Sequence, residues 1–168
     1  MPYTDHFAHA DDLIAHLDTF VVGLGDPLLK VKYTGFLSVS AVTVYELAVK
    51  DIFIAFASQK NSVFGSFTAE YCSRMNGKIK REDLEKDFIK RFGSKYMKRF
   101  QKKIEECEKT SLRISGISVK ACYSNLITWR NQFAHEGVLS TTATYDEVKK
   151  SYQQGKMIID CLAQTLVR

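Results

Sequence analysis

The chain has 168 residues, of which 45% are hydrophobic and 26% are charged, with 24 Lys+Arg against 19 Asp+Glu. This length suits one domain that buries its own core, and the apolar content excludes a wholly disordered chain. Two prolines and nine glycines are too few for a β-sandwich, which needs a turn about every 8–12 residues. No apolar run approaches the roughly 18 residues of a membrane span, and the first residues lack a secretory signal. We therefore expect a cytoplasmic globular protein.

Neither the cysteines nor the histidines form a set that is typical of a metal site. The four cysteines are scattered without CxxC spacing, as expected for reduced, partly buried thiols of a cytosolic protein: Cys72, Cys107, Cys122 and Cys161. His9, Asp12 and His16 would share the polar face of one helix. A metal ion could use that spacing, but a solvated face is the commoner origin of such residues. We expect no metal and no cofactor.

Helical periodicity dominates the first half of the chain. Apolar residues recur every three or four positions over 5–22, which predicts an amphipathic helix ended by glycines and Pro27. A long apolar stretch rich in β-branched residues then runs from about 28 to 58. A parallel strand is an alternative, but strands rarely exceed about 10 residues and nothing interrupts this stretch after Gly35. We therefore predict a long central helix, followed by a shorter one near 66–75.

The second half is also predicted to be helical. Helices are expected over 81–92 and 94–109, and another over 118–134 with Gly137 as its C′ residue. The last helix, about 144–167, begins with a capping box formed by Thr144 and Glu147. The prediction is one all-α domain over residues 1–168. It would be an up-and-down helical bundle with two long helices and an inserted basic helical segment.

Positive charge is concentrated in residues 74–109. This segment holds 13 Lys/Arg and 7 Asp/Glu, a net charge of +6, whereas the rest of the chain has a net charge of −1. The structural interpretation of this charge is a solvated helix face, and the functional one is a surface that binds a phosphate backbone. Charge alone does not decide between them. The candidate nucleic-acid-binding residues are Lys90, Arg91, Lys95, Lys98, Arg99 and Lys102.

Aromatic residues are interleaved with these basic ones. Phe88, Phe92, Tyr96 and Phe100 stand four residues apart, as one stripe of a helix requires. Such a stripe could stack bases, but at helical spacing it more often forms the buried side of the helix. We favour the core interpretation.

Residues 129–137 combine side chains that are unusual near a helix end. At about 100° per residue, Arg130 falls on the core side of its helix. A guanidinium among core residues needs a carboxylate partner, and Glu46 on the central helix is the best candidate. Asn131 and His135 are four residues apart, so all three polar groups meet at one rim of the bundle. This set suits a phosphodiester, because Arg binds phosphate oxygens and His moves a proton near neutral pH.

A purely structural interpretation of the same residues stays open. It is an Arg–Glu core pair together with a histidine that stabilises the C-terminus of its helix.

The pattern Arg130-Asn131-x-x-x-His135, near the end of a helix in a small all-α domain, resembles the motif of the HEPN superfamily. That motif is an Arg, four to six residues, and a His, often with a polar residue directly after the Arg. The small residues on either side of the histidine are also usual there. Glu46 matches an acidic residue embedded in an earlier helix of the family. The chain is most similar to the small prokaryotic ribonucleases and toxin-like members.

The resemblance implies a homodimer whose composite site holds two Arg–His sets. Many members are metal-independent endoribonucleases in toxin–antitoxin, abortive-infection or RNA-processing systems, so RNA and an antitoxin are the implied partners. His135 would be the general acid/base for attack by the ribose 2′-OH, and Arg130 would stabilise the developing charge. Asn131 would hold RNA or the histidine, with Glu46 in support. The expected products are a 2′,3′-cyclic phosphate and a 5′-hydroxyl, and DNA should be inert.

Some members of the superfamily have lost catalysis. The alternative function is therefore a non-catalytic helical interaction or nucleic-acid-binding module that partners another protein. This alternative expects stable dimerisation or partner binding without RNA turnover, and a variant of Arg130 that is chiefly unstable. The resemblance says nothing about the role of residues 74–109.

Overall fold

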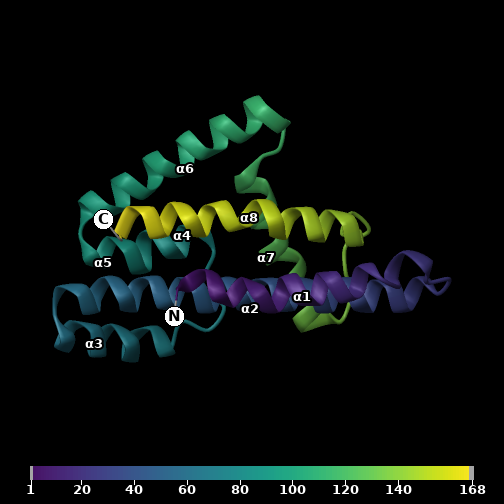
Figure 1. The fold of residues 1–168 in the computed structure, drawn as a ribbon, viewed down its shortest axis with the longest axis horizontal. Coiled ribbons are helices and arrows are strands. Elements are labelled where there is room, and N and C mark those ends of the chain that lie inside the picture. Colours follow the sequence, from purple (N-terminus) through teal and green to yellow (C-terminus); the bar gives the residue numbers. More distant parts are fainter. Residues whose placement is uncertain (1, 167–168) are drawn as a thin grey trace.

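Two long helices, α2 (Pro27–Lys60) and α8 (Tyr145–Leu166), lie side by side at the centre of the molecule (Figure 1). The computed structural model describes residues 2–166. α2 begins where the Asp26 carboxylate accepts a hydrogen bond from the N–H of Leu28 (2.8 Å), and Pro27 occupies the first helical position, where no N–H is needed. The middle of α2 is buried around most of its circumference. This confirms the predicted central helix and excludes the strand.

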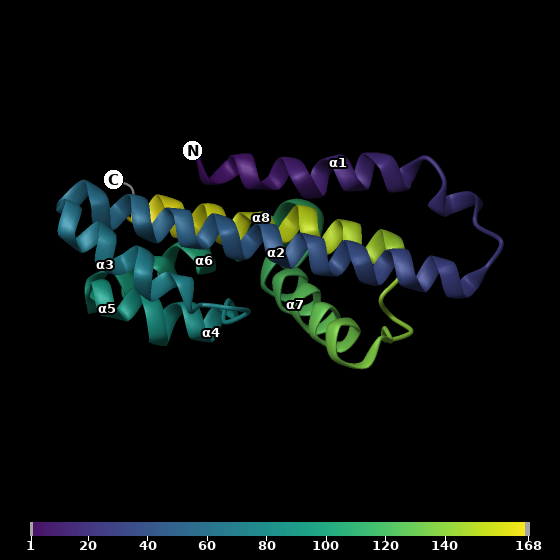
Figure 2. The same cartoon turned by 90° about the horizontal axis from the view of Figure 1, so that it is seen from below.

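Helix α1 (Phe7–Asp18) covers one side of the α2–α8 pair, while α3, α4, α5 and α7 lie on the other side (Figure 2). Short 3₁₀ turns, η1 (Tyr3–His6) and η2 (Val21–Gly23), flank α1, so the α-helix is shorter at both ends than the predicted 5–22. Its apolar stripe is buried as predicted, and its polar side is attached to α8 through Asp18. The carboxylate of Asp18 pairs with the ammonium of Lys149 and accepts a hydrogen bond from the Tyr145 hydroxyl at 2.9 Å.

Between α2 and α7 the chain forms two helical layers. Helix α3 (Ser62–Ser73) starts and ends earlier than the predicted 66–75, because the Asn61 side chain caps it by accepting from the N–H of Val63. The predicted helix over 81–92 is present. Its three parts are α4 (Arg81–Asp83), the π-helical turn η3 (Leu84–Ile89) and α5 (Lys90–Phe92).

The longer helix α6 (Ser94–Ser115) follows Gly93 and continues beyond the predicted end at 109. The aromatic stripe of this region is buried or half-buried against the core, as predicted: Phe88, Phe92, Tyr96 and Phe100.

Helix α7 (Val119–Glu136) crosses the two long helices at an angle, and α8 then returns along α2 (Figures 1 and 2). The predicted cap of α8 is half right. The N–H of Glu147 donates to the Thr144 hydroxyl at 3.2 Å, but the Glu147 carboxylate pairs with Lys150 at 2.9 Å instead of reaching back to the cap. Residues 2–166 contain helices and no strand, which confirms the all-α bundle.

All four cysteines are free, and three are buried: Cys72, Cys122 and Cys161. Burial raises the pKa of Cys72 to about 11 and that of Cys161 to about 12. Across residues 2–166, no three His, Cys, Asp or Glu side chains gather closely enough to hold a metal ion. His9, Asp12 and His16 are exposed on α1. No helix within the described part of the chain has the length and apolar character needed to cross a membrane.

Candidate active site at the end of helix α7

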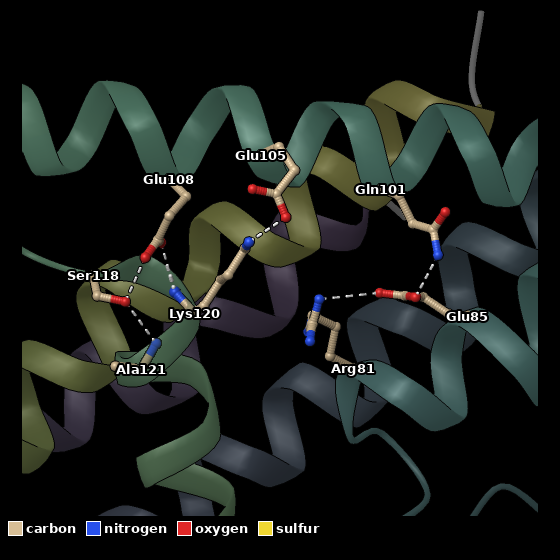
Figure 3. A network of polar contacts seen from close by, with 8 residues as sticks. All are labelled: Arg81, Glu85, Gln101, Glu105, Glu108, Ser118, Lys120 and Ala121. Atoms are coloured by element: carbon tan, nitrogen blue, oxygen red, sulfur yellow. Dashed lines mark hydrogen bonds and ion pairs between the residues drawn. The ribbon is translucent and has the colours of Figure 1, made fainter.

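The N-terminus of α7 is fixed by acidic residues of α6 (Figure 3). The Ser118 hydroxyl caps the helix by accepting from the N–H of Ala121 at 3.0 Å, and it donates in turn to the Glu108 carboxylate. Glu108 also accepts from the N–H of Lys120 at 3.0 Å, and the Lys120 ammonium pairs with Glu105. Helix α7 therefore leaves α6 in a defined direction, and its far end carries the motif.

The C-terminal half of α7 is positioned by a close contact with α2. Gly35 lies in the N-terminal third of α2, and the ring of Phe133 packs directly on its backbone. The helix then ends at Gly137, which has a φ of +69° and donates its N–H to the carbonyl of Phe133 at 2.9 Å. This left-handed residue confirms the predicted end of the helix. Phe133 thus fixes the turn that lies between Arg130 and His135.

Arg130 is half-buried, and its nearest polar partner is the residue beside it. Its Nη1 donates to Oδ1 of Asn131 at 2.9 Å. The predicted ion pair with Glu46 is wrong: among residues 2–166 no carboxylate lies within 4.0 Å of the Arg130 guanidinium. Because a half-buried cation without a carboxylate is poorly compensated, this group is well suited to bind an anion.

Glu46 instead supports the neighbourhood of Arg130 through a loop. One of its oxygens pairs with the Lys50 ammonium at 2.7 Å, one helical turn away. The other accepts from the N–H of Gly77 at 2.7 Å. Gly77 has a φ of +74°, and a Cβ atom built on it would lie 3.2 Å from Nη1 of Arg130. Glu46 and Arg130 therefore both lie against the same glycine.

The loop that carries Gly77, residues 74–80, brings the basic segment to the motif helix. The buried hydroxyl of Tyr123 on α7 donates to the carbonyl of Ile79 at 2.5 Å and ties the loop to the helix. Met75 and Ile79 are buried beneath it, whereas Arg74 and Lys78 are exposed.

His135 lies in the last turn of α7 and is exposed. None of the hydrogen bonds within residues 2–166 uses its ring. It lies five positions after Arg130, about 7.5 Å farther along the helix axis. Arg130, Asn131 and His135 all lie in the last two turns of α7, where the first two are half-buried and His135 is exposed.

The other predicted basic residues lie farther from the motif. Lys90 and Arg91 are on α5, and the remaining four are on the first half of α6: Lys95, Lys98, Arg99 and Lys102. The motif end of α7 points away from α6 (Figure 1). The structure thus brings the loop at 74–80, and not these lysines, into contact with Arg130.

Three of the seven acidic residues within 74–109 make contacts inside the bundle. Glu85 is buried, where it accepts from Gln101 at 2.8 Å and pairs with Arg81 at 3.4 Å (Figure 3). Glu105 and Glu108 bind the start of α7, as described above. Glu82, Asp87 and Glu106 are exposed, so the outward face of the segment carries charges of both signs.

Two glycines that hold the site were missed by the sequence analysis. Gly77 belongs to an Asn-Gly dipeptide, which indicates a turn but not what packs against it. Gly35 stands alone in a long apolar helix, and an isolated glycine there often signals close packing. That signal was available for Gly35, whereas nothing local could show that Gly77 meets Arg130.

The fold and the motif together define an all-α bundle with an Arg-Asn-x-x-x-His set at one helix end. A family model described as RiboL-PSP-HEPN matches residues 5–168, so the chain belongs to this HEPN family. Neither a curated protein nor a solved structure matches the chain significantly.

Proposed function

We propose that the protein is a metal-independent endoribonuclease whose active site is formed by Arg130, Asn131 and His135. The observation that carries the proposal is the state of Arg130, which is half-buried, held by Asn131 and without a carboxylate partner in the described part of the chain. In the structural alternative, a carboxylate in the core would pair with Arg130 and neutralise its charge. Membership of a HEPN family supports the same activity.

In the proposed reaction the ribose 2′-oxygen attacks the adjacent phosphorus, and the bond from phosphorus to the 5′-oxygen breaks. A histidine takes the proton from the 2′-hydroxyl, and a proton is delivered to the departing 5′-oxygen. The products are a 2′,3′-cyclic phosphate and a 5′-hydroxyl. Arg130 stabilises the extra negative charge on the phosphoryl oxygens, and Asn131 fixes the guanidinium through its Oδ1.

Two proton transfers suit two histidines, which supports a homodimer with a composite site. The N-terminal part of α2 offers an apolar surface for such a contact. Leu28 exposes 62% of its surface and Phe36 exposes 54%, beside the glycine on which Phe133 packs. Val138, directly after the motif helix, exposes 54%. Apolar surface of this kind is typical of protein contacts, and here it adjoins the candidate active site.

The activity is tested by incubating a structured RNA with the protein in EDTA. We expect cleavage by the wild type and a loss of about 100-fold or more for His135→Ala and for Arg130→Ala, while both variants keep the helical circular dichroism of the wild type. Cleavage by His135→Ala at the wild-type rate would remove the proposal. A stable dimer that never cleaves RNA would instead support the non-catalytic module.

A toxin or defence role is tested separately in cells. Induced wild-type protein should arrest growth and His135→Ala should not, and co-expression of a neighbouring antitoxin gene should restore growth. Growth that is equally impaired by both proteins would count against a toxic nuclease.

A further inference from the structure

A pocket of about 120 Å³ opens between α2, α3 and α5, lined by five phenylalanines and a tyrosine. Helices α3 and α5, which line it, lie on the same side of the α2–α8 pair as α7 (Figure 2). Phe67 exposes 67% of its surface and Phe64 exposes 37%, so aromatic rings form the rim and not only the floor. This open pocket is similar in size to a cavity of about 150 Å³ that admits benzene, which suits a single six-membered ring.

The mouth of the pocket continues into a basic hollow of about 370 Å³. Arg91, Tyr71 and Phe88 line both spaces. The Arg91 guanidinium lies over Tyr71, with Cζ 5.1 Å from the ring centroid, and its Nε donates to the backbone carbonyl of Asp87. The guanidinium is therefore held at the junction between the aromatic pocket and the hollow.

Three cations face one carboxylate in the hollow. Arg74, Lys78 and Arg91 line it together with Asp87. Arg74 approaches Glu70 at 3.8 Å, and both side chains are largely exposed, so this pair is weak. The surplus of positive charge favours an anionic occupant.

The hollow ends at the loop that supports Arg130. Arg74 and Lys78 flank Gly77, whose backbone lies against the Arg130 guanidinium. An extended anionic chain that crosses the hollow is thereby directed toward the candidate active site.

We propose that the aromatic pocket binds an unpaired base of single-stranded RNA, while Arg74, Lys78 and Arg91 bind the adjoining phosphates. This inference rests on the proposed ribonuclease function. Aromatic rings beside a positively charged groove are the usual means of holding single strands without reading their sequence. An apolar peptide would fill the pocket but would not compensate the surplus positive charge of the hollow. The inserted segment thus holds the substrate through a stacked base, and its outer lysines on α6 are not required for this contact.

The test uses a fluorescent single-stranded DNA oligonucleotide, because it stacks its bases but has no 2′-OH and cannot be cleaved by the proposed reaction. Its partner probe is an abasic oligonucleotide of equal length, which carries the same phosphates without bases. Affinities are measured by fluorescence anisotropy for the wild type, Phe67→Ala and Arg91→Ala. Val63→Ala is the matched control, because Val63 is on the same helix, is 75% exposed and does not line the pocket.

We expect Phe67→Ala to weaken binding of the base-bearing probe by about fivefold or more and to leave the abasic probe unchanged. Phe67→Trp should retain binding, Arg91→Ala should weaken both probes, and Val63→Ala neither. Unchanged binding by Phe67→Ala would overturn the pocket, even if the protein cleaves RNA. A loss of binding that follows a change in oligomer mass by light scattering would also overturn it and mark a protein contact. If the protein binds the base-bearing probe more tightly but cleaves no RNA, the result would support base binding in the pocket and contradict the proposed ribonuclease function.

Discussion

The ring of Phe133 lies on the backbone of Gly35 so closely that a Cβ atom built on the glycine would come within 2.1 Å of the ring carbon Cδ2. This contact joins the N-terminal third of α2 to the turn between Arg130 and His135. The position of the motif therefore depends on the absence of a side chain at residue 35.

Gly35→Ala should impair the active site by displacing Phe133. An alanine in a helix interior normally stabilises by about 1 kcal/mol relative to glycine. Here we expect a net loss of about 1–3 kcal/mol in unfolding free energy, because the ring and the end of α7 must move, and a larger loss in RNA cleavage. Urea unfolding and initial cleavage rates measure the two effects. Gly25→Ala, where no atom lies within 4 Å of the new Cβ, is the control and should match the wild type in both. Equal behaviour of the two variants would contradict the role of the contact.

Gly77→Ala should reduce RNA cleavage by more than its loss of unfolding free energy can explain. The residue has a φ of +74°, so alanine costs about 1–2 kcal/mol in backbone strain, and its Cβ would also lie 3.2 Å from Nη1 of Arg130. Gly116 has a φ of +68° and open space around it. Gly116→Ala therefore carries the same backbone strain without touching the guanidinium. We expect similar unfolding free energies for both variants and a loss of cleavage only for Gly77→Ala. A similar loss in both would show that strain alone is responsible.

Arg130→Ala should be a well-folded variant. Breaking a buried ion pair typically costs about 3–5 kcal/mol, whereas Arg130 is half-buried and bonded to a neighbouring amide. We expect a loss of about 1 kcal/mol or less in urea unfolding, with cleavage abolished. Arg130→Lys should not restore activity, because an ammonium lacks the planar donor pair of Arg. A destabilisation as large as that of a broken core pair would favour the structural interpretation.

Acid should weaken the attachment of α1 to α8. The hydrogen bond from Lys149 lowers the pKa of Asp18, and the hydrogen bond from the Tyr145 hydroxyl lowers it further. A carboxylate with a lowered pKa contributes stability above its unfolded pKa of about 3.9, and that contribution disappears as pH falls through the folded value. Asp18→Asn should thus be less stable than the wild type near neutral pH by about 0.2–1 kcal/mol, with the difference vanishing in acid. Urea midpoints against pH measure this. Asp12→Asn, on the same helix and exposed, should show no such difference at any pH.

The helices and the motif were predictable because local periodicity determines them. The apolar stretch over 28–58 and the Thr144 cap predicted the bounds of α2 and α8 to within two residues. The ends of α1 and α6 were less accurate, because 3₁₀ turns flank α1 and the turns after residue 109 of α6 depend on contacts with the chain that follows. The Ser111 hydroxyl, for example, donates to the carbonyl of Ile117.

The partner of Glu46 was not predictable in the same way. The sequence pattern placed Arg130 and Glu46 among core residues, and an ion pair between them was the simplest hypothesis. The structure satisfies Glu46 with Lys50, four residues along the same helix, and with a backbone N–H of the inserted loop. The path of that loop depends on tertiary packing of Met75 and Ile79, which no spacing rule describes.

The central claim is that Arg130 and His135 cleave RNA through the ribose 2′-OH. The most direct measurement uses a DNA oligonucleotide with one ribonucleotide, incubated in EDTA and analysed by mass spectrometry. The account predicts a single cut, a 2′,3′-cyclic phosphate on the ribonucleotide and a 5′-hydroxyl on the other fragment, for the wild type and not for His135→Ala. Cuts at deoxyribonucleotides, a 5′-phosphate product, or an equal yield from His135→Ala would contradict it.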